Sequence, residues 1–339
     1  MDPRPIVSAT YQKERLFLSP YACFSEKTRG RETWEEPCPM RTDFQRDRDR
    51  IIHSKSFRRL KNKTQVFLSP EGDHYRTRLT HTLDVSQIGR SIARALSLNE
   101  DLTEAIALGH DLGHTPFGHA GERTLKRLTG GEFEHSRQSL RVVDVLENEG
   151  KGLNLTFEVR DGIVNHQTGG HPATLEGKVV CLADKIAYIN HDIDDARRAG
   201  LLRDEDLPED LVEILGRTNR ERINRMIMAV VTESLGQPDV RMEKEVFRAT
   251  YAMRDFLFKR VYADERARTE EVRSDRMLSV LFGFLTEHPG ELPEFYRQLA
   301  EKWPLRQVVC DYISSMSDRY AIHVFQKYFI PSSWNLESL

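Results

Sequence analysis

The chain has 339 residues and a formal net charge of −3, which excludes a general nucleic-acid binder that relies on overall positive charge. Hydrophobic residues make up 39% and charged residues 30%, which favours a soluble, largely helical protein with a sizeable interior. The 4 cysteines form no CxxC pair, so they indicate reduced cytosolic thiols rather than a zinc ribbon. No apolar run is long enough for a signal peptide or a membrane span, and we expect a cytoplasmic protein.

Residues 1–50 are polar and rich in Arg, Glu and Pro, and we expect an irregular N-terminal arm followed by the start of a charged helix. That helix, over 41–60, should pack one side. The side chains expected to pack are Phe44, Ile51, Ile52 and Phe57. Residues 63–76 predict a short β-hairpin, because TQVF favours a strand and SPEGD a turn.

Cations surround this predicted hairpin. They are Arg58, Arg59, Lys61, Lys63, Arg76 and Arg78. One interpretation is surface decoration. The other is a polyphosphate clamp, which requires that the cations converge on one cleft, since phosphates are held by preorganised cations.

Helices are predicted over 80–98, capped by Thr80, and over 101–111. The first carries an apolar side made of Leu83, Ile88, Ile92 and Leu96. The second buries Leu102, Ile106 and Leu108. Further helices are expected from His119, near His135, over 156–167 and over 174–198, and helical patterns continue to the C-terminus.

The stretch HDLGHTPFGHAGE, residues 110–122, holds three histidines, an aspartate and a glutamate around a Gly-Pro turn. On the predicted helix 174–198, Asp184, Tyr188 and Asp192 recur every four residues and form a polar row apart from the apolar stripe. This row is either an ordinary outer face or part of a site.

Four residues form a candidate metal site, and they are His81, His110, Asp111 and Asp184. Two imidazoles and two carboxylates suit Mn²⁺, Fe²⁺, Co²⁺, Ni²⁺ or Zn²⁺, and Mg²⁺ less well. A lone histidine is more often a satisfied polar residue, so the joint pattern carries the prediction. A two-histidine zinc face from His110 and His114 is an alternative, but it lacks the Glu that a zincin has beside its first His.

The motifs FRRLKNKTQVF, RTRLTHTLDV, HDLGHTPFGHAGE, FEH, LADKIAYINHDIDDA and CDYISSMSDRYAI resemble those of the HD-domain deoxyguanosine-triphosphate triphosphohydrolase family, in its triphosphohydrolase-like branch. The resemblance covers residues 18–330 and implies a mainly α fold, an HD-domain helical bundle with elaborations. We expect an HD catalytic core over 51–200 and a helical C-terminal part over 201–339 packed on it, as one continuous domain.

The resemblance implies that the protein hydrolyses a deoxynucleoside triphosphate, dGTP or several dNTPs, to the deoxynucleoside and inorganic triphosphate. It assigns the metal to His81, His110, Asp111 and Asp184. It assigns catalytic roles to His119 as the acid for the leaving oxygen, Glu122 as its orienting partner, and His114 and His135 at the α-phosphate. It assigns substrate binding to Arg78 and Lys185 for phosphate, Tyr188 and Asp192 for the 3′-hydroxyl, and Gln65 near the sugar or base.

Two other functions stay open from the residues themselves. One is a different HD phosphohydrolase, acting on a nucleoside monophosphate or an alarmone. The other is a nucleotide-binding regulator with little turnover, against which the His119–Glu122 pair argues. The resemblance also implies a tetramer or hexamer and a second nucleotide as activator, for which the Arg-rich residues 41–63 are a hypothetical interface or effector site. Single-stranded nucleic acid is a partner that nothing in the sequence supports.

Overall fold

The computed structural model describes residues 4–65, 76–261 and 265–331, and within these ranges the regular structure is helical. The first half of the chain forms α1 (Arg4–Phe17), α2 (Asp43–His53), α3 (Lys55–Arg59), α4 (Arg78–Ala95), α5 (Glu100–Gly109), α6 (Gly118–Leu128), α7 (His135–Arg141), α8 (Phe157–Val164) and α9 (Leu175–Arg198). The second half forms α10 (Glu209–Leu215), α11 (Asn219–Ser234), α12 (Lys244–Arg260), α13 (Glu265–Glu287), α14 (Glu294–Ala300), α15 (Leu305–Ser315) and α16 (Asp318–Phe329). Short helical turns are η1 (Ser25–Lys27), η2 (Leu60–Asn62), η3 (Val142–Leu146), η4 (Asn148–Gly150), η5 (Asp204–Asp206) and η6 (Pro289–Glu291). The predicted mainly α fold is confirmed.

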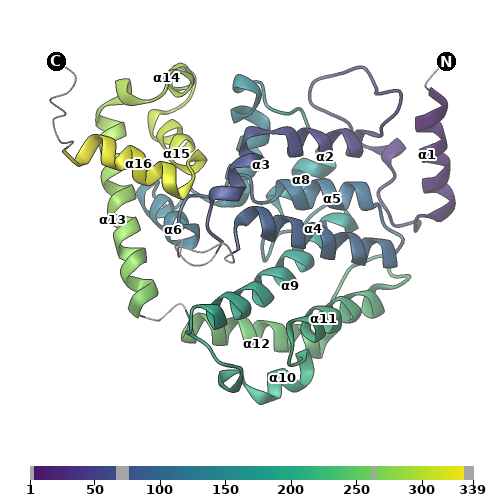
Figure 1. Cartoon of the computed structure of the whole chain (residues 1–339). Coiled ribbons are helices and arrows are strands. Elements are labelled where there is room, and N and C mark those ends of the chain that lie inside the picture. The colour runs from purple at the N-terminus through teal and green to yellow at the C-terminus, as the bar shows by residue number, and fades with distance from the viewer. Residues whose placement is uncertain (1–3, 66–75, 262–264, 332–339) are drawn as a thin grey trace, which may run out of the picture.

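The centre of the molecule is a bundle in which α4 packs against both α5 and α9 (Figure 1). Helices α2 and α8 cover α5, and α11 and α12 pack on α9. The predicted apolar residues Ile88 and Ile92 are buried in this core, but Leu83 is 50% exposed and Val85 is buried instead. Asp184, at the centre of α9, therefore faces α4 and the end of α5 from within the bundle.

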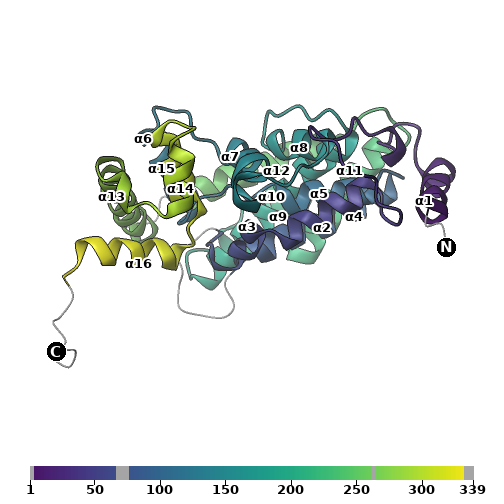
Figure 2. The same cartoon turned by 90° about the horizontal axis from the view of Figure 1, so that it is seen from above.

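A second apolar cluster joins α6 to the C-terminal helices α13, α14, α15 and α16. Figures 1 and 2 show these C-terminal helices at the end of the molecule opposite α1. Phe117 and Leu125 belong to this cluster, so the segment that follows His110 and Asp111 leaves the central bundle and packs against the C-terminal part. Leu146 packs against both clusters.

The N-terminal segment is helical, and the prediction of an irregular arm was wrong there. Within α1, the buried Glu14 accepts hydrogen bonds from the N–H and the hydroxyl of Ser25, at 2.8 and 2.5 Å. Pro5 lies in the first turn, where a helix tolerates proline because that N–H has no helical partner. The polar composition of this segment gave no indication of the helix, which tertiary contacts stabilise.

The charged helix is broken in two at Ser54, whose ψ of 154° is extended. Its hydroxyl accepts a hydrogen bond from the N–H of Phe57 at 3.1 Å, which starts α3. Phe44, Ile51 and Phe57 are buried as expected, whereas Ile52 is 37% exposed, contrary to the prediction.

The predicted hairpin falls largely on residues 66–75, which lie outside the described residues. At its ends, Thr64 and Thr77 form an isolated antiparallel bridge. Helix α4 begins earlier than predicted: Thr77, not Thr80, caps it, and its hydroxyl accepts a hydrogen bond from the N–H of Thr80 at 3.5 Å. The earlier start places Arg78 and His81 on the same helix, three residues apart.

Candidate metal centre and active site

His110 lies at the C-terminal end of α5 and is almost completely buried. Its Nδ1 atom is 2.6 Å from the carbonyl oxygen of Ala107, so Nδ1 carries the hydrogen and donates it. Its Nε2 atom is buried and has no hydrogen-bond partner among the described residues. A buried lone pair without a donor is the arrangement expected of a metal-ligating imidazole.

The other three predicted metal ligands surround this nitrogen. Oδ1 of Asp184 lies 3.7 Å from Nε2 of His110 and 3.1 Å from Nε2 of His81. Oδ1 of Asp111 lies 3.8 Å from Nε2 of His110. Ligand atoms of His81, His110 and Asp111 all lie within 4.8 Å of one another. These residues therefore fit a divalent cation, and α4, α5 and α9 each contribute to the set.

Arg78 neutralises part of this buried negative charge. Its Nη1 atom donates to Oδ2 of Asp111 at 2.8 Å, and both side chains are buried. Burial acts against the charged form of Asp111, but Arg78 together with the nearby His110, His114 and His81 outweighs it, and the pKa of Asp111 is held well below its usual range. Arg78 thus orients a predicted ligand, and its Nε atom is buried with no hydrogen-bond partner among the described residues.

A turn separates these residues from a second polar group. Phe117 adopts φ 62°, and a Cβ on Gly121 would lie 2.0 Å from the carbonyl oxygen of Pro116. A Cβ on Gly113 would lie 2.1 Å from the backbone nitrogen of Ser139, in α7. The glycines therefore allow a close approach of backbones that no other residue permits.

The second group consists of His114, His119, Glu122 and His135. Oε1 of Glu122 accepts from Nδ1 of His135 at 2.8 Å, while Nδ1 of His119 is 4.0 Å from Oε2. Burial disfavours the charged His135, but Glu122 outweighs it and raises the pKa of His135. Burial lowers the pKa of His114 well below its usual range. His119 is half-exposed, so it faces the solvent side of this group.

The polar row of α9 meets α12. Lys185 donates to the hydroxyl of Tyr251 at 2.5 Å, and the guanidinium of Arg254 lies 4.8 Å from the Tyr251 ring. Burial raises the pKa of Tyr188, which stands half-buried beside this pair, while Asp192 is buried. The row is therefore no solvent face. Tyr251 and Arg254 were not predicted, although their spacing on a helical segment was a usable signal.

Two further histidines were also missed. Nε2 of His166 lies 3.2 Å from Nε2 of His135, and its Nδ1 is 2.7 Å from the carbonyl oxygen of Ile163. Burial lowers the pKa of His166 to about 3. Nδ1 of His191 lies 3.1 Å from Nδ1 of His81. Neither stands in the pattern of spacing that indicated the other site residues, so only the fold reveals them.

Gln65 is buried, and its backbone oxygen lies 3.4 Å from Nη2 of Arg78. Its side-chain oxygen Oε1 is buried with no hydrogen-bond partner among the described residues. The end of the predicted hairpin therefore reaches the metal-site region.

Of the six predicted clamp cations, Arg78 contacts the predicted metal ligand Asp111, and Lys63 contacts the backbone of His114. Lys63 is fully buried and donates to the carbonyl oxygens of His114 and Ser314, at 2.5 and 2.7 Å. Burial lowers the pKa of Lys63 to about 7. Arg76 pairs with Asp194 at 3.3 Å instead. The cations do not form one clamp, and Lys63 links the turn at His114 to Ser314 in the C-terminal part.

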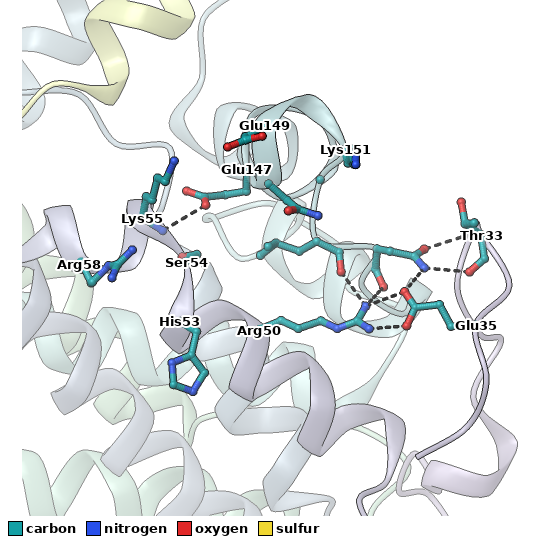
Figure 3. A pocket seen from close by; sticks show the side chains of 14 residues that line it. Thr33, Glu35, Arg50, His53, Ser54, Lys55, Arg58, Glu147, Glu149 and Lys151 are labelled. Atoms are coloured by element: carbon teal, nitrogen blue, oxygen red, sulfur yellow. Dashed lines mark hydrogen bonds and ion pairs between the residues drawn. The ribbon is translucent and has the colours of Figure 1, made fainter. Parts of the chain in front are cut away.

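The Arg-rich segment 41–63 is partly neutralised within the chain. Arg41 pairs with Asp49 at 2.6 Å, and Arg50 pairs with Glu35. A cavity of about 870 Å³ lies beside this segment, between the start of α3 and the loop 147–154 (Figure 3). Lys55, Arg58, Glu149 and Lys151 line it, and none of the predicted site residues does. This cavity is therefore separate from the histidine groups.

Residues 78–189 match the HD domain, and residues 240–327 match the phosphohydrolase-associated domain. A protein of Caldanaerobacter subterraneus subsp. tengcongensis named deoxyguanosinetriphosphate triphosphohydrolase-like is 58% identical, over 96% of this chain and 96% of its own. A protein of the same name from Desulfatibacillum aliphaticivorans is 50% identical, over 95% and 97%. The chain belongs to the deoxyguanosinetriphosphate triphosphohydrolase-like family of HD-domain proteins. Its match to the HD domain makes it a phosphohydrolase.

The HD match begins at Arg78 and ends at Ile189, so it contains all four predicted metal ligands of this family member. Tyr251 and Arg254 fall in the phosphohydrolase-associated match instead. A crystal structure of a hypothetical protein from Aquifex aeolicus superposes with a TM-score of 0.48 at 21% identity, covering 84% of this chain and 71% of that chain. No helix among the described residues has the length and apolar character that crossing a membrane requires.

Proposed function

We propose that this protein hydrolyses a deoxynucleoside triphosphate to the deoxynucleoside and inorganic triphosphate, with a divalent metal at His81, His110, Asp111 and Asp184. One observation carries the proposal. Nε2 of His110 is buried and has no hydrogen-bond partner among the described residues, and it lies 3.7 Å from Oδ1 of Asp184, a second predicted ligand. Near this atom lie the second group, which can transfer protons, and the polar row of α9, which can bind a substrate. Hydrolysis of a nucleotide requires both. The names of the relatives support a triphosphate substrate.

A divalent metal in this site would supply positive charge toward the phosphate and lower the pKa of water. Asp111 and Asp184 are suited to hold it because both carboxyls have pKa values below the usual range, so they are charged at neutral pH. Arg78 keeps Asp111 oriented, and the carbonyl of Ala107 orients His110.

His119 would donate the proton that the leaving 5′-oxygen needs. It is half-exposed and lies on α6 across the turn from the metal ligands, so a substrate can reach it. Glu122 raises the pKa of His135 and so favours its protonated form, and this cation would stabilise negative charge that develops at the α-phosphate. His114, which burial keeps neutral, has a free Nδ1 among the described residues and would contact the same phosphate.

Lys185, Tyr188 and Asp192 would bind the phosphate tail and the sugar along one face of α9. The contact between Lys185 and Tyr251 adds α12 to this surface, so the phosphohydrolase-associated part would complete the substrate site. Gln65 would stand at the sugar or base side, next to Arg78.

Product analysis tests the proposal. The protein, loaded with Mn²⁺, is given each dNTP singly and in mixtures, and the products are separated. Inorganic triphosphate is expected. Orthophosphate or pyrophosphate would favour a different HD phosphohydrolase, and binding without turnover would favour a regulator. A rise in turnover in mixtures over single dNTPs, with a tetramer or hexamer in solution, is expected if a second nucleotide activates the enzyme.

A further inference from the structure

A chain of three side chains leads from the protein surface to His81. Oδ2 of Asp84, on α4, lies 2.9 Å from Nε2 of His191, on α9. Nδ1 of His191 then lies 3.1 Å from Nδ1 of His81. The two rings meet edge to face, with centroids 5.2 Å apart and planes at 81°, which suits an N–H···N contact. Asp84 is 44% exposed, whereas both histidines are buried.

Hydrogen-bond chemistry assigns the protons along this chain. A carboxylate only accepts, so Nε2 of His191 carries a hydrogen and donates it to Asp84. A neutral His191 then has a lone pair at Nδ1, and His81 must donate from its own Nδ1. That assignment leaves Nε2 of His81 without a hydrogen, directed at Asp184 at 3.1 Å.

The opposite assignment would leave His81 unable to bind a metal. If Nδ1 of His191 donated, the neutral His81 would carry its hydrogen at Nε2 and would have no lone pair for a cation. His110 avoids this choice because a backbone carbonyl accepts from its Nδ1. Nδ1 of His81 instead faces Nδ1 of His191, so the tautomer of His81 depends on the protonation of that side chain.

We infer that Asp84 and His191 are positioning residues that hold His81 in the tautomer able to bind the metal. The inference rests on the metal site of the proposed function. Arg76 also faces Asp84, with Nε 3.6 Å from Oδ2, and it pairs with Asp194 on α9. Asp84 thus lies between a guanidinium and an imidazole, as an oriented acceptor.

Two substitutions of His191 separate the role from simple packing. Asparagine places its side-chain oxygen near the position of Nδ1, so His191→Asn retains an acceptor for His81. His191→Phe retains a ring but removes both nitrogens. We expect Phe to lower the affinity for Mn²⁺ about 10–100-fold, the usual effect of losing an outer partner of a ligand. Asn should restore most of that affinity.

Mn²⁺ affinity is measured by titration calorimetry and by competition with a chelator, and thermal unfolding of the metal-free variants checks folding. Equal Mn²⁺ affinity in the parent and His191→Phe would overturn the inference. A parent that binds no Mn²⁺ would instead refute the metal site and the proposed function.

Asp84→Ala is the second variant, and it keeps the test decisive if His191→Phe does not fold. Its matched control is Asp194→Ala, which removes the other carboxylate that faces Arg76 and leaves the contact of Asp84 with His191 intact. We expect weaker Mn²⁺ binding in Asp84→Ala and parent-like binding in Asp194→Ala. Equal affinities in the two variants would exclude a positioning role for Asp84.

Discussion

Nδ1 of His135 lies 2.8 Å from Oε1 of Glu122, whereas Nδ1 of His119 lies 4.0 Å from Oε2 of the same carboxylate. The backbone N–H of His135 also donates to Oε1, at 3.0 Å. Glu122 is therefore primarily the partner of His135. In the proposed reaction, the main role of Glu122 would be to favour the protonated His135 at the α-phosphate, and its second role would be to orient His119.

His119→Ala should retain Mn²⁺ and substrate binding and lose turnover by about 10²–10⁴-fold, because a positioned acid is removed from the leaving oxygen. Steady-state kinetics with separate kcat and KM values check this. His171→Ala, at another exposed histidine, is the control and should match the parent. An unchanged kcat in His119→Ala would remove this residue from the acid role.

Glu122→Gln should lower kcat as well, but for a different reason. Without the carboxylate, burial dominates at His135 and its pKa should fall, so a smaller fraction of His135 is protonated at a given pH. The activity of Glu122→Gln should therefore recover partly at lower pH, while that of His119→Ala should not. Kinetics between pH 5 and pH 8 would show it, and parallel pH profiles for the two variants would contradict the division of roles.

Mn²⁺ should raise the melting temperature of the parent, because a ligand that binds only the folded state stabilises it, by about 2.7 kcal/mol at a concentration 100 times Kd. His110→Ala removes the unpartnered Nε2 and should abolish this shift as well as turnover. Differential scanning fluorimetry with and without chelator is the measurement. A full Mn²⁺ shift in His110→Ala would place the ion elsewhere.

Asp311, on α15, is fully buried and accepts hydrogen bonds from Nε and Nη2 of Arg141, each at 2.8 Å. Asp311→Ala would leave the guanidinium without its partner, which should lower the free energy of unfolding by about 3–5 kcal/mol. Asp239→Ala breaks the exposed pair with Lys178 and should cost about 0–1 kcal/mol. Urea unfolding measures the free energy of unfolding of both variants. Equal losses would show that the buried pair contributes no more to stability than the exposed pair.

Glu35 gives the stability a dependence on acid. Its hydrogen bonds with Arg50 lower the pKa of Glu35 from the ordinary 4.5 to about 2 in the folded protein. The folded state thus binds this proton less readily than the unfolded state, so its stabilising effect is complete above pH 4.5 and is lost as the pH falls toward 2. Melting temperature between these pH values should fall less in Glu35→Gln than in the parent. Glu36→Gln, at an exposed neighbour, should leave the slope unchanged.

The sequence alone determined the helical class and most helices of the central bundle, because apolar residues recur there at helical spacing. It also determined the metal-ligand candidates, since His81, His110, Asp111 and Asp184 together offer two imidazoles and two carboxylates, and the motif resemblance then assigned the metal to the same four residues. Local composition misled at α1, where buried polar contacts such as that of Glu14 with Ser25 stabilise a helix.

Only the tertiary structure decided which distant groups complete the site. His166, His191 and Tyr251 come from elements whose approach depends on how α8, α9 and α12 pack, and no spacing within one element encodes that approach. The tertiary structure also decided which of the predicted cations are near the site. Lys63 is buried and donates to the carbonyls of His114 and Ser314, because the turn after His110 packs against the C-terminal helices rather than the central bundle.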